Sequence, residues 1–135
     1  MKKTALLSVL LIIATVFALV SCASADPWDN AIYTENTTLG EGSITYYLEV
    51  IVEEHSVTFT MKTDKTNLGE ALRESGIVEG EESSYGLYIK TVNGILADYD
   101  KDASFWGITK DGESTFGADT ITIDDGAHYE LTYSK

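Results

Sequence analysis

One group of acidic side chains at alternating positions resembles the start of a known ion-binding motif. Asp98, Asp100 and Asp102 match positions one, three and five of a calcium-binding EF-hand loop. The motif then breaks down, because Ala103 stands where the loop requires glycine and Thr109 where it requires a bidentate glutamate. We therefore predict a solvated acidic loop without a metal, with a weak calcium site as the alternative. The same interpretation applies to a second acidic group, Glu79, Glu81 and Glu82.

Residue types that carry out catalysis are few in this chain and stand at no recognisable spacing. The sequence has no Gly-x-Ser-x-Gly motif, no phosphate-binding glycine loop and no zinc pattern. The two histidines, His55 and His128, have no motif around them, so we interpret them as structural or surface residues. We therefore expect a protein that is not an enzyme and needs no cofactor. The alternative, a hydrolase that acts at the cell envelope, would require two carboxylates that the fold brings together in a cleft.

The only cysteine of the chain, Cys22, stands at the end of a secretory signal. Two lysines at positions 2 and 3 precede an apolar run over residues 5–20, which is the order typical of a signal peptide. This run is shorter than the roughly 20 apolar residues that a membrane-spanning helix needs. The sequence Leu19-Val20-Ser21-Cys22 closely resembles the bacterial lipobox, in which a small residue precedes a cysteine that is diacylated on its sulfur.

The signal pattern predicts a lipoprotein on the extracytoplasmic face of the cell membrane. Residues 1–21 would be removed as a signal peptide, and Cys22 would become the lipidated first residue, since two acyl chains on one cysteine anchor stably. A single cysteine also excludes a disulfide-stapled domain. The alternatives are an ordinary signal peptide with Ala23–Ala25 as its cleavage site, or a short uncleaved anchor.

The charge of the chain limits its partners. Twenty-two acidic residues stand against nine basic ones, which gives a formal net charge of −13. Nucleic acid is therefore excluded as a partner, because it attracts basic surfaces. The same charge keeps the domain off anionic lipid headgroups, so we expect membrane attachment through the lipid anchor only.

The part of the chain that follows the signal divides into a polar segment and a folded domain. Residues 22–42 are rich in turn formers and show no periodicity, which predicts a lipidated tether. The alternative is that Trp28, Ile32 and Tyr33 pack back onto the domain. The folded domain is predicted over residues 43–135, long enough for one core.

Periodicity within residues 43–135 predicts strands on both sides of one helix. Residues alternate between apolar and polar over 44–52 and again over 57–62, which predicts a hairpin. Asn67 followed three residues later by Glu70 predicts a helix start, and Gly76 predicts its end.

The rest of the domain is predicted to be mostly strands. An acidic loop is predicted over 78–84. Short strands are then predicted over residues 85–92, 95–96, 104–109, 120–123 and 129–133, with tight turns at Asn93-Gly94 and Asp111-Gly112. The fold class that follows is α+β, a β-grasp-like, mostly antiparallel sheet with one short helix.

The order of these features resembles the C-terminal domain of transcobalamin and intrinsic factor, and the bacterial domains of unknown function grouped with it. The resemblance covers nearly all of residues 43–133. It rests on the leading hairpin, the helix start Asn67–Leu72, the strand Tyr88–Gly94, the aromatic pair Phe105-Trp106, the break at Gly117 and the closing segment Asp125–Leu131.

This resemblance implies a β-grasp-like domain that binds a soluble ligand, which in the animal members is cobalamin held against a second, helical domain. The corrin contact would correspond to Trp106, Gly107 and Ile108, although Gly107 stands where those proteins carry a larger polar side chain. Adjacent strand residues point to opposite faces, so only one of Phe105 and Trp106 can be in the core.

Two functions remain open at this point. The first is a membrane-tethered binding module for a small molecule, with cobalamin or another corrinoid as the suspected ligand and Trp106, Gly107, Ile108, Tyr85 and Tyr88 as its site. The second is a non-catalytic adaptor that uses the same aromatic surface to dock onto another envelope protein.

Overall fold

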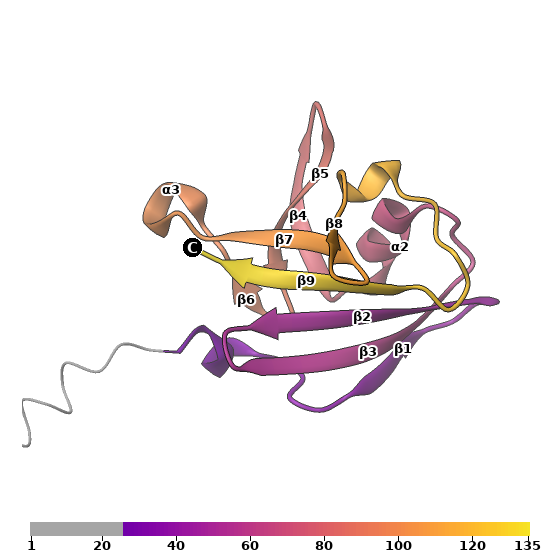
Figure 1. The fold of residues 1–135 in the computed structure, drawn as a ribbon, viewed down its shortest axis with the longest axis horizontal. Helices are drawn as coiled ribbons and strands as arrows, with labels where there is room; N and C mark the ends of the chain where they lie inside the picture. Colours follow the sequence, from indigo (N-terminus) through magenta and orange to yellow (C-terminus); the bar gives the residue numbers. More distant parts are fainter. Residues whose placement is uncertain (1–25) are drawn as a thin grey trace, which may run out of the picture.

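The computed structural model describes residues 26–135, which form a six-stranded mixed sheet and a smaller three-stranded sheet (Figure 1). The large sheet has the strand order β1-β3-β2-β9-β7-β8. Its strands are β1 (Thr37–Gly40), β2 (Ile44–Val52), β3 (His55–Thr63), β7 (Phe105–Lys110), β8 (Glu113–Ser114) and β9 (His128–Ser134). Strands β2 and β9 run parallel at its centre, and β1 runs parallel to β3 at one edge, whereas the other pairs are antiparallel.

The second layer lies over one face of the large sheet. It contains helix α2 (Leu68–Ser75) and the antiparallel sheet of β4 (Val78–Ser83), β5 (Gly86–Val92) and β6 (Ile95–Leu96). Figure 1 shows the β4–β5 hairpin projecting away from the large sheet. Three short elements complete the described part of the chain: the 3-10 helices η1 (Pro27–Asn30) and η2 (Ala118–Thr120), and the single-turn helix α3 (Tyr99–Asp102).

Helix α2 begins and ends where the sequence predicts. The Asn67 side chain accepts a hydrogen bond from the Glu70 N–H at 3.1 Å, which caps the helix start. Gly76 ends the helix in the left-handed region at φ 74°. Leu68, Ala71 and Leu72 form its buried face. The helix therefore packs its one apolar stripe onto the sheet.

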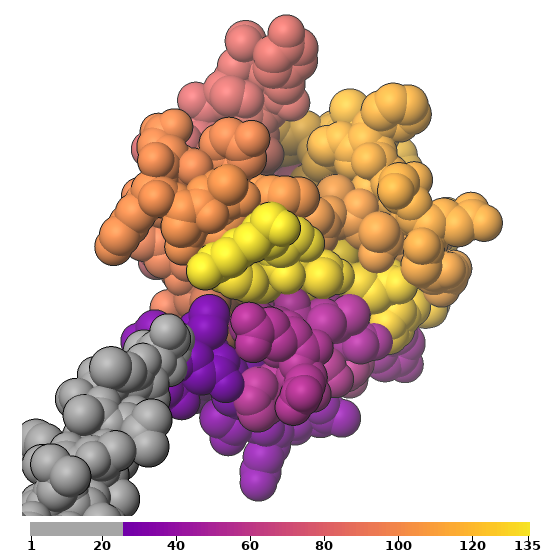
Figure 2. Space-filling view, turned by 60° about the vertical axis from the view of Figure 1, so that its left-hand side comes forward, coloured from indigo at the N-terminus to yellow at the C-terminus, as the bar shows by residue number. Residues whose placement is uncertain are grey.

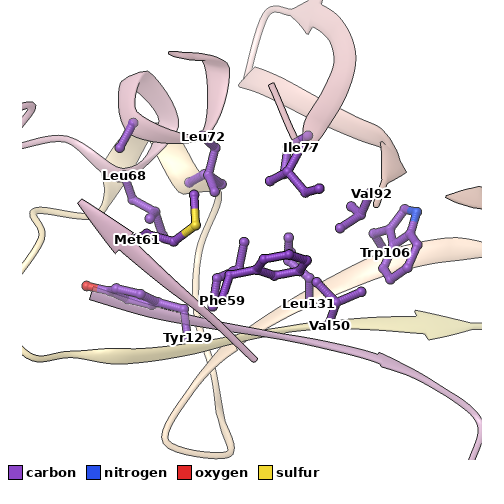
Figure 3. Packing of buried hydrophobic residues seen from close by; sticks show 14 of the residues in the cluster. Val50, Phe59, Met61, Leu68, Leu72, Ile77, Val92, Trp106, Tyr129 and Leu131 are labelled. Atoms are coloured by element: carbon purple, nitrogen blue, oxygen red, sulfur yellow. The ribbon is translucent and has the colours of Figure 1, made fainter. Parts of the chain in front are cut away.

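The core lies between the large sheet and the second layer (Figure 3). Alternate residues of the central strands point into it, because successive side chains of a strand face opposite ways. These buried strand residues include Leu48, Val50, Phe59, Met61, Tyr129 and Leu131. Leu68 and Leu72 close the core from the helix side. The predicted α+β fold, with a mostly antiparallel β-grasp-like arrangement and one main helix, is confirmed.

The predicted tether is wrong from residue 26 onward. Strand β1 pairs with β3, and Trp28 of η1 stacks on His55 with ring centroids 5.1 Å apart. The Asn93 side chain, fully buried, accepts a hydrogen bond from the Tyr33 N–H and donates one to the Tyr33 C=O, both at 2.9 Å. Residues 26–42 are therefore part of the domain, as the alternative interpretation had it.

Two other local predictions are also wrong. The acidic segment 78–84 is not a loop, because its residues form strand β4 and pair with β5. Residues 120–123 do not form a strand: η2 ends at Thr120, and Thr122 makes an isolated bridge to Asn67. The predicted signal peptide and Cys22 lie outside the described residues. Within residues 26–135, no helix combines the length and the apolar character needed to span a membrane.

Candidate ligand-binding surface

Two aromatic side chains project into solvent where the tip of the β4–β5 hairpin meets the segment before η2. Tyr85 is 92% exposed and Phe116 is 85% exposed. The two segments lie against each other, because a Cβ atom placed on Gly117 would lie 3.8 Å from the Tyr85 carbonyl oxygen. We call Tyr85 and Phe116 the distal aromatic pair. Aromatic rings this exposed provide contact area for a ligand or a partner.

The carboxylate of Asp119 fixes the position of this surface. Its Oδ2 atom accepts a hydrogen bond from the Leu87 N–H of β5 at 2.9 Å. Arg73 of α2 donates to both carboxylate oxygens, from Nη1 at 2.6 Å and from Nη2 at 2.8 Å. The Asp119 carbonyl oxygen accepts a bond from the Asn67 side chain at 2.7 Å. Asp119 thus ties η2 to the helix and to the hairpin at once.

Two glycines leave room for this carboxylate. A Cβ atom on Gly69 of α2 would overlap Asp119 Oδ1, and a Cβ atom on Gly86 would overlap Oδ2. Gly86 also has a φ of 97°, a backbone conformation that favours glycine. The sequence therefore provides a glycine on each side of the Asp119 side chain.

Arg73 joins a second carboxylate to the same cluster. Its Nε and Nη2 atoms donate to the two oxygens of Glu82 at 2.8 and 2.9 Å, a paired geometry specific to arginine. The hydrogen bonds from Arg73 lower the pKa of Asp119, and the Leu87 N–H adds to this effect. The hydrogen bonds that Arg73 donates to Glu82 likewise lower the pKa of Glu82, and both carboxylates raise the pKa of Arg73. All three groups therefore stay charged at neutral pH.

The cluster predicts an acid-dependent contribution to stability. Folding lowers the pKa of Asp119 below about 4, the range of an unfolded aspartate. The contribution of this carboxylate to the free energy of unfolding is therefore fully present above about pH 4, and it is lost as the pH falls through the folded-state pKa. We expect Asp119→Asn to reduce the free energy of unfolding by about 1–2 kcal/mol at neutral pH, and by progressively less in acid. Urea unfolding at several pH values measures this difference. The exposed Asp100, changed to Asn, is the control, and an equal effect of Asp119→Asn at all pH values would contradict the account.

The structure places Trp106 in the core and not on a ligand-facing surface. Its side chain is 7% exposed and packs edge-on against Tyr133, with ring centroids 5.6 Å apart. The indole N–H donates to the carbonyl oxygens of Lys90 at 3.1 Å and Ile95 at 3.3 Å. Phe105, on the opposite face of β7, is 41% exposed. The exposed member of the aromatic pair is therefore Phe105.

The other predicted site residues do not form one exposed surface with Trp106. Gly107 faces the same side as Phe105, and a Cβ atom there would lie 3.9 Å from the Phe105 ring. Ile108 is partly buried and packs against the core. Tyr88 is exposed on β5, three residues after Tyr85 at the hairpin tip. Of the five predicted residues, only the two tyrosines belong to the projecting hairpin.

Sequence reasoning missed Phe116, Arg73 and Asp119. Phe116 follows a short edge strand and lies in no periodic pattern, so nothing in its neighbourhood distinguishes it from a core residue. Arg73 and Asp119 are 46 positions apart and meet only through the fold. The glycines at 69 and 86 were the one signal, since both mark places where another group approaches the backbone closely.

The acidic residues after β6 are partly engaged by hydrogen bonds within their own segment. Tyr99–Asp102 is a single helical turn, and Asp102 Oδ1 accepts hydrogen bonds from the main chain and the side chain of Ser104. These bonds lower the pKa of Asp102. Across residues 26–135, no three His, Cys, Asp or Glu side chains are arranged so that they could hold a metal ion.

Comparison with known proteins places this domain in a structural class. It has the fold of haptocorrin, whose structure in complex with Cbi superposes with a TM-score of 0.50 at 23% identity. That match covers 68% of this chain and 25% of haptocorrin, so the chain spans about a quarter of that protein. The predicted transcobalamin-like fold is therefore confirmed.

A protein from Ruminococcus gnavus ATCC 29149 is more similar in sequence. Its structure, described as that of a "putative metal binding protein", superposes with a TM-score of 0.63 at 36% identity, over 69% of this chain and 98% of that one. The chain belongs to the same family as this R. gnavus protein. No family model matches the sequence, and the curated proteins contain no match.

Proposed function

We propose that this protein is a non-catalytic binding module for a soluble small molecule, and that the ligand is a corrinoid. The observation that carries the proposal is the distal aromatic pair: two exposed rings, Tyr85 and Phe116, on segments that Asp119 ties to the rest of the domain. The main-chain segments that carry these rings are already ordered, so binding a flat ligand would require only the two side chains to become fixed.

The similar proteins support this choice of ligand. The domain shares its fold with haptocorrin, whose structure contains Cbi, and its family includes a protein described as metal-binding. A corrinoid carries its own cobalt ion, so a protein can capture it without a metal site built from side chains. This agrees with the lack of a His, Cys, Asp or Glu cluster in residues 26–135.

We further propose that the module works on the outer face of the cell membrane. The support is the sequence pattern at the N-terminus, in which Cys22 follows an apolar signal segment. Asp26, where the described domain begins, stands four positions after this cysteine. Lipidation of Cys22 would therefore hold the domain close to the bilayer, and Cys22→Ser should release the protein from membranes.

Calorimetric titration with cobalamin and cobinamide tests the binding proposal. We expect saturable binding to the mature protein, and about five-fold weaker binding after Tyr85→Ala or Phe116→Ala, since one stacked ring contributes about 1 kcal/mol. Tyr99→Ala, an exposed tyrosine on α3, is the matched control and should leave binding unchanged. If neither corrinoid binds, the ligand proposal is overturned and a protein partner in the envelope becomes the better explanation.

A further inference from the structure

A groove of about 540 Å³ opens at the end of the domain where the described chain begins. It lies between η1, the Asn93-Gly94 turn, α3 and the end of β9, so residues far apart in the sequence surround it. Figure 2 shows the indigo N-terminal residues beside the yellow end of β9, with the orange α3 region next to them. We call this the N-terminal groove. Its lining includes Asp26, Pro27, Leu96, Lys101, Asp102 and Lys135.

Exposed apolar side chains flank the N-terminal groove. Leu96, which lines it, is 57% exposed, and Ile32 beside it is 65% exposed. Ile32 lies directly against Gly94, and its N–H donates to the Asn93 carbonyl oxygen at 3.0 Å. The two side chains are therefore held on the same end of the domain, on either side of the Asn93-Gly94 turn.

The groove also carries charges of both signs. Lys101 and Lys135 line it together with Asp26 and Asp102. The Lys135 ammonium lies 3.6 Å from the Asp102 carboxylate, so a lysine and an aspartate stand side by side. This arrangement complements a zwitterionic group, with the ammonium groups opposite a phosphate and the carboxylates opposite an amine.

The proposed lipid anchor would bring this end of the domain to the membrane. Asp26 stands four positions after Cys22, and an extended chain covers at most about 3.6 Å per position, so Asp26 can lie no more than about 14 Å from the anchored cysteine. We propose that the N-terminal groove rests on the bilayer and takes up headgroups of zwitterionic phospholipid, with Leu96 and Ile32 at the level of the headgroups. This inference rests on the lipid anchor of the proposed function.

Membrane contact at this end has a consequence for the ligand-binding surface. The β4–β5 hairpin, which carries Tyr85, points in another direction from η1 (Figure 1). A domain that rests on the membrane through the N-terminal groove would therefore hold the distal aromatic pair towards the surrounding solution, where a soluble ligand arrives.

Fluorescent labels on introduced cysteines test the contact in the lipidated protein. The sulfur of Cys22, the only native cysteine, is blocked by the lipid, so Leu96→Cys and Phe116→Cys each provide one free thiol. The labelled proteins are placed in vesicles of phosphatidylethanolamine and phosphatidylcholine, both zwitterionic, and exposed to acrylamide, a neutral quencher in water. We expect quenching at position 96 to be several-fold weaker in the vesicles than in detergent, and quenching at position 116 to be the same in both.

Charge reversal tests whether Lys101 and Lys135 contact the lipid headgroups. Lys101→Glu together with Lys135→Glu should restore much of the quenching at position 96, whereas Lys62→Glu, an exposed lysine near the far end of β3, should not. Equal quenching at 96 in vesicles and in detergent, from a protein that floats with the vesicles, would overturn the membrane contact and leave the anchor standing. A protein that fails to float would overturn both.

Discussion

Replacement of Trp106 by alanine is expected to lower the free energy of unfolding by about 3–5 kcal/mol, the range for large aromatic residues in protein cores. The side chain is buried against Tyr133, and its indole N–H bonds to two main-chain carbonyl oxygens, those of Lys90 and Ile95. Removing it leaves a cavity and deprives both carbonyls of a donor. These carbonyls belong to β5 and β6, so the change also weakens the attachment of the small sheet to the large one.

The neighbouring residue provides a matched control for this prediction. Phe105→Ala removes an aromatic ring of similar size one position away, but on the exposed face of β7, so it should change the stability by less than about 1 kcal/mol. Chemical denaturation of the two variants side by side makes the comparison. Equal losses would show that Trp106 is not the core residue of the pair.

The result matters for any test of ligand binding. Because Trp106 stabilises the fold, a loss of binding in Trp106→Ala would report unfolding and would not locate a site. Phe105, Tyr85 and Phe116 are exposed and can be changed with little effect on the core. Substitutions at these three positions therefore separate binding from stability.

The sequence alone predicts the elements in which one face is buried and the other exposed. Strands β2 and β3 alternate strictly, so their buried residues could be assigned from periodicity. Helix α2 has a capping asparagine and a terminal glycine, which fix its ends within the sequence itself. Both turns of the Asn-Gly and Asp-Gly type occur where predicted, with positive φ at both central residues.

Elements that depend on distant partners could not be predicted. Strand β4 is exposed on both faces after Val78, so its glutamates show no alternation, and only pairing with β5 makes it a strand. Alternation placed Phe105 and Trp106 on opposite faces but could not say which one is buried, because that depends on the neighbouring Tyr133 of β9. The distal aromatic pair depends in the same way on Asp119, whose partners come from α2 and β5.

The N-terminal segment illustrates this limit most clearly, and it leads to the second large effect. Residues 26–42 have a composition typical of a linker, yet one side chain 60 positions away binds the Tyr33 main chain through both of its polar atoms. Asn93 thus has two roles. It adopts the positive φ of 52° that its turn requires, and it pairs with the Tyr33 N–H and C=O groups.

Replacement of Asn93 by glycine separates these roles, because glycine keeps the turn and removes the side chain. We expect Asn93→Gly to lower the free energy of unfolding by about 2–3 kcal/mol, since two main-chain groups in a part-buried site lose their partners. Amide hydrogen exchange at Ile32 and Tyr33 should accelerate before that of β2 or β9. Asp111→Gly is the control, because Asp111 has a φ of 51° in an equivalent turn and an exposed side chain, so its change should stay within about 1 kcal/mol. If both variants lose the same stability, the effect lies in the turns, and the Asn93 side chain does not hold the N-terminal segment.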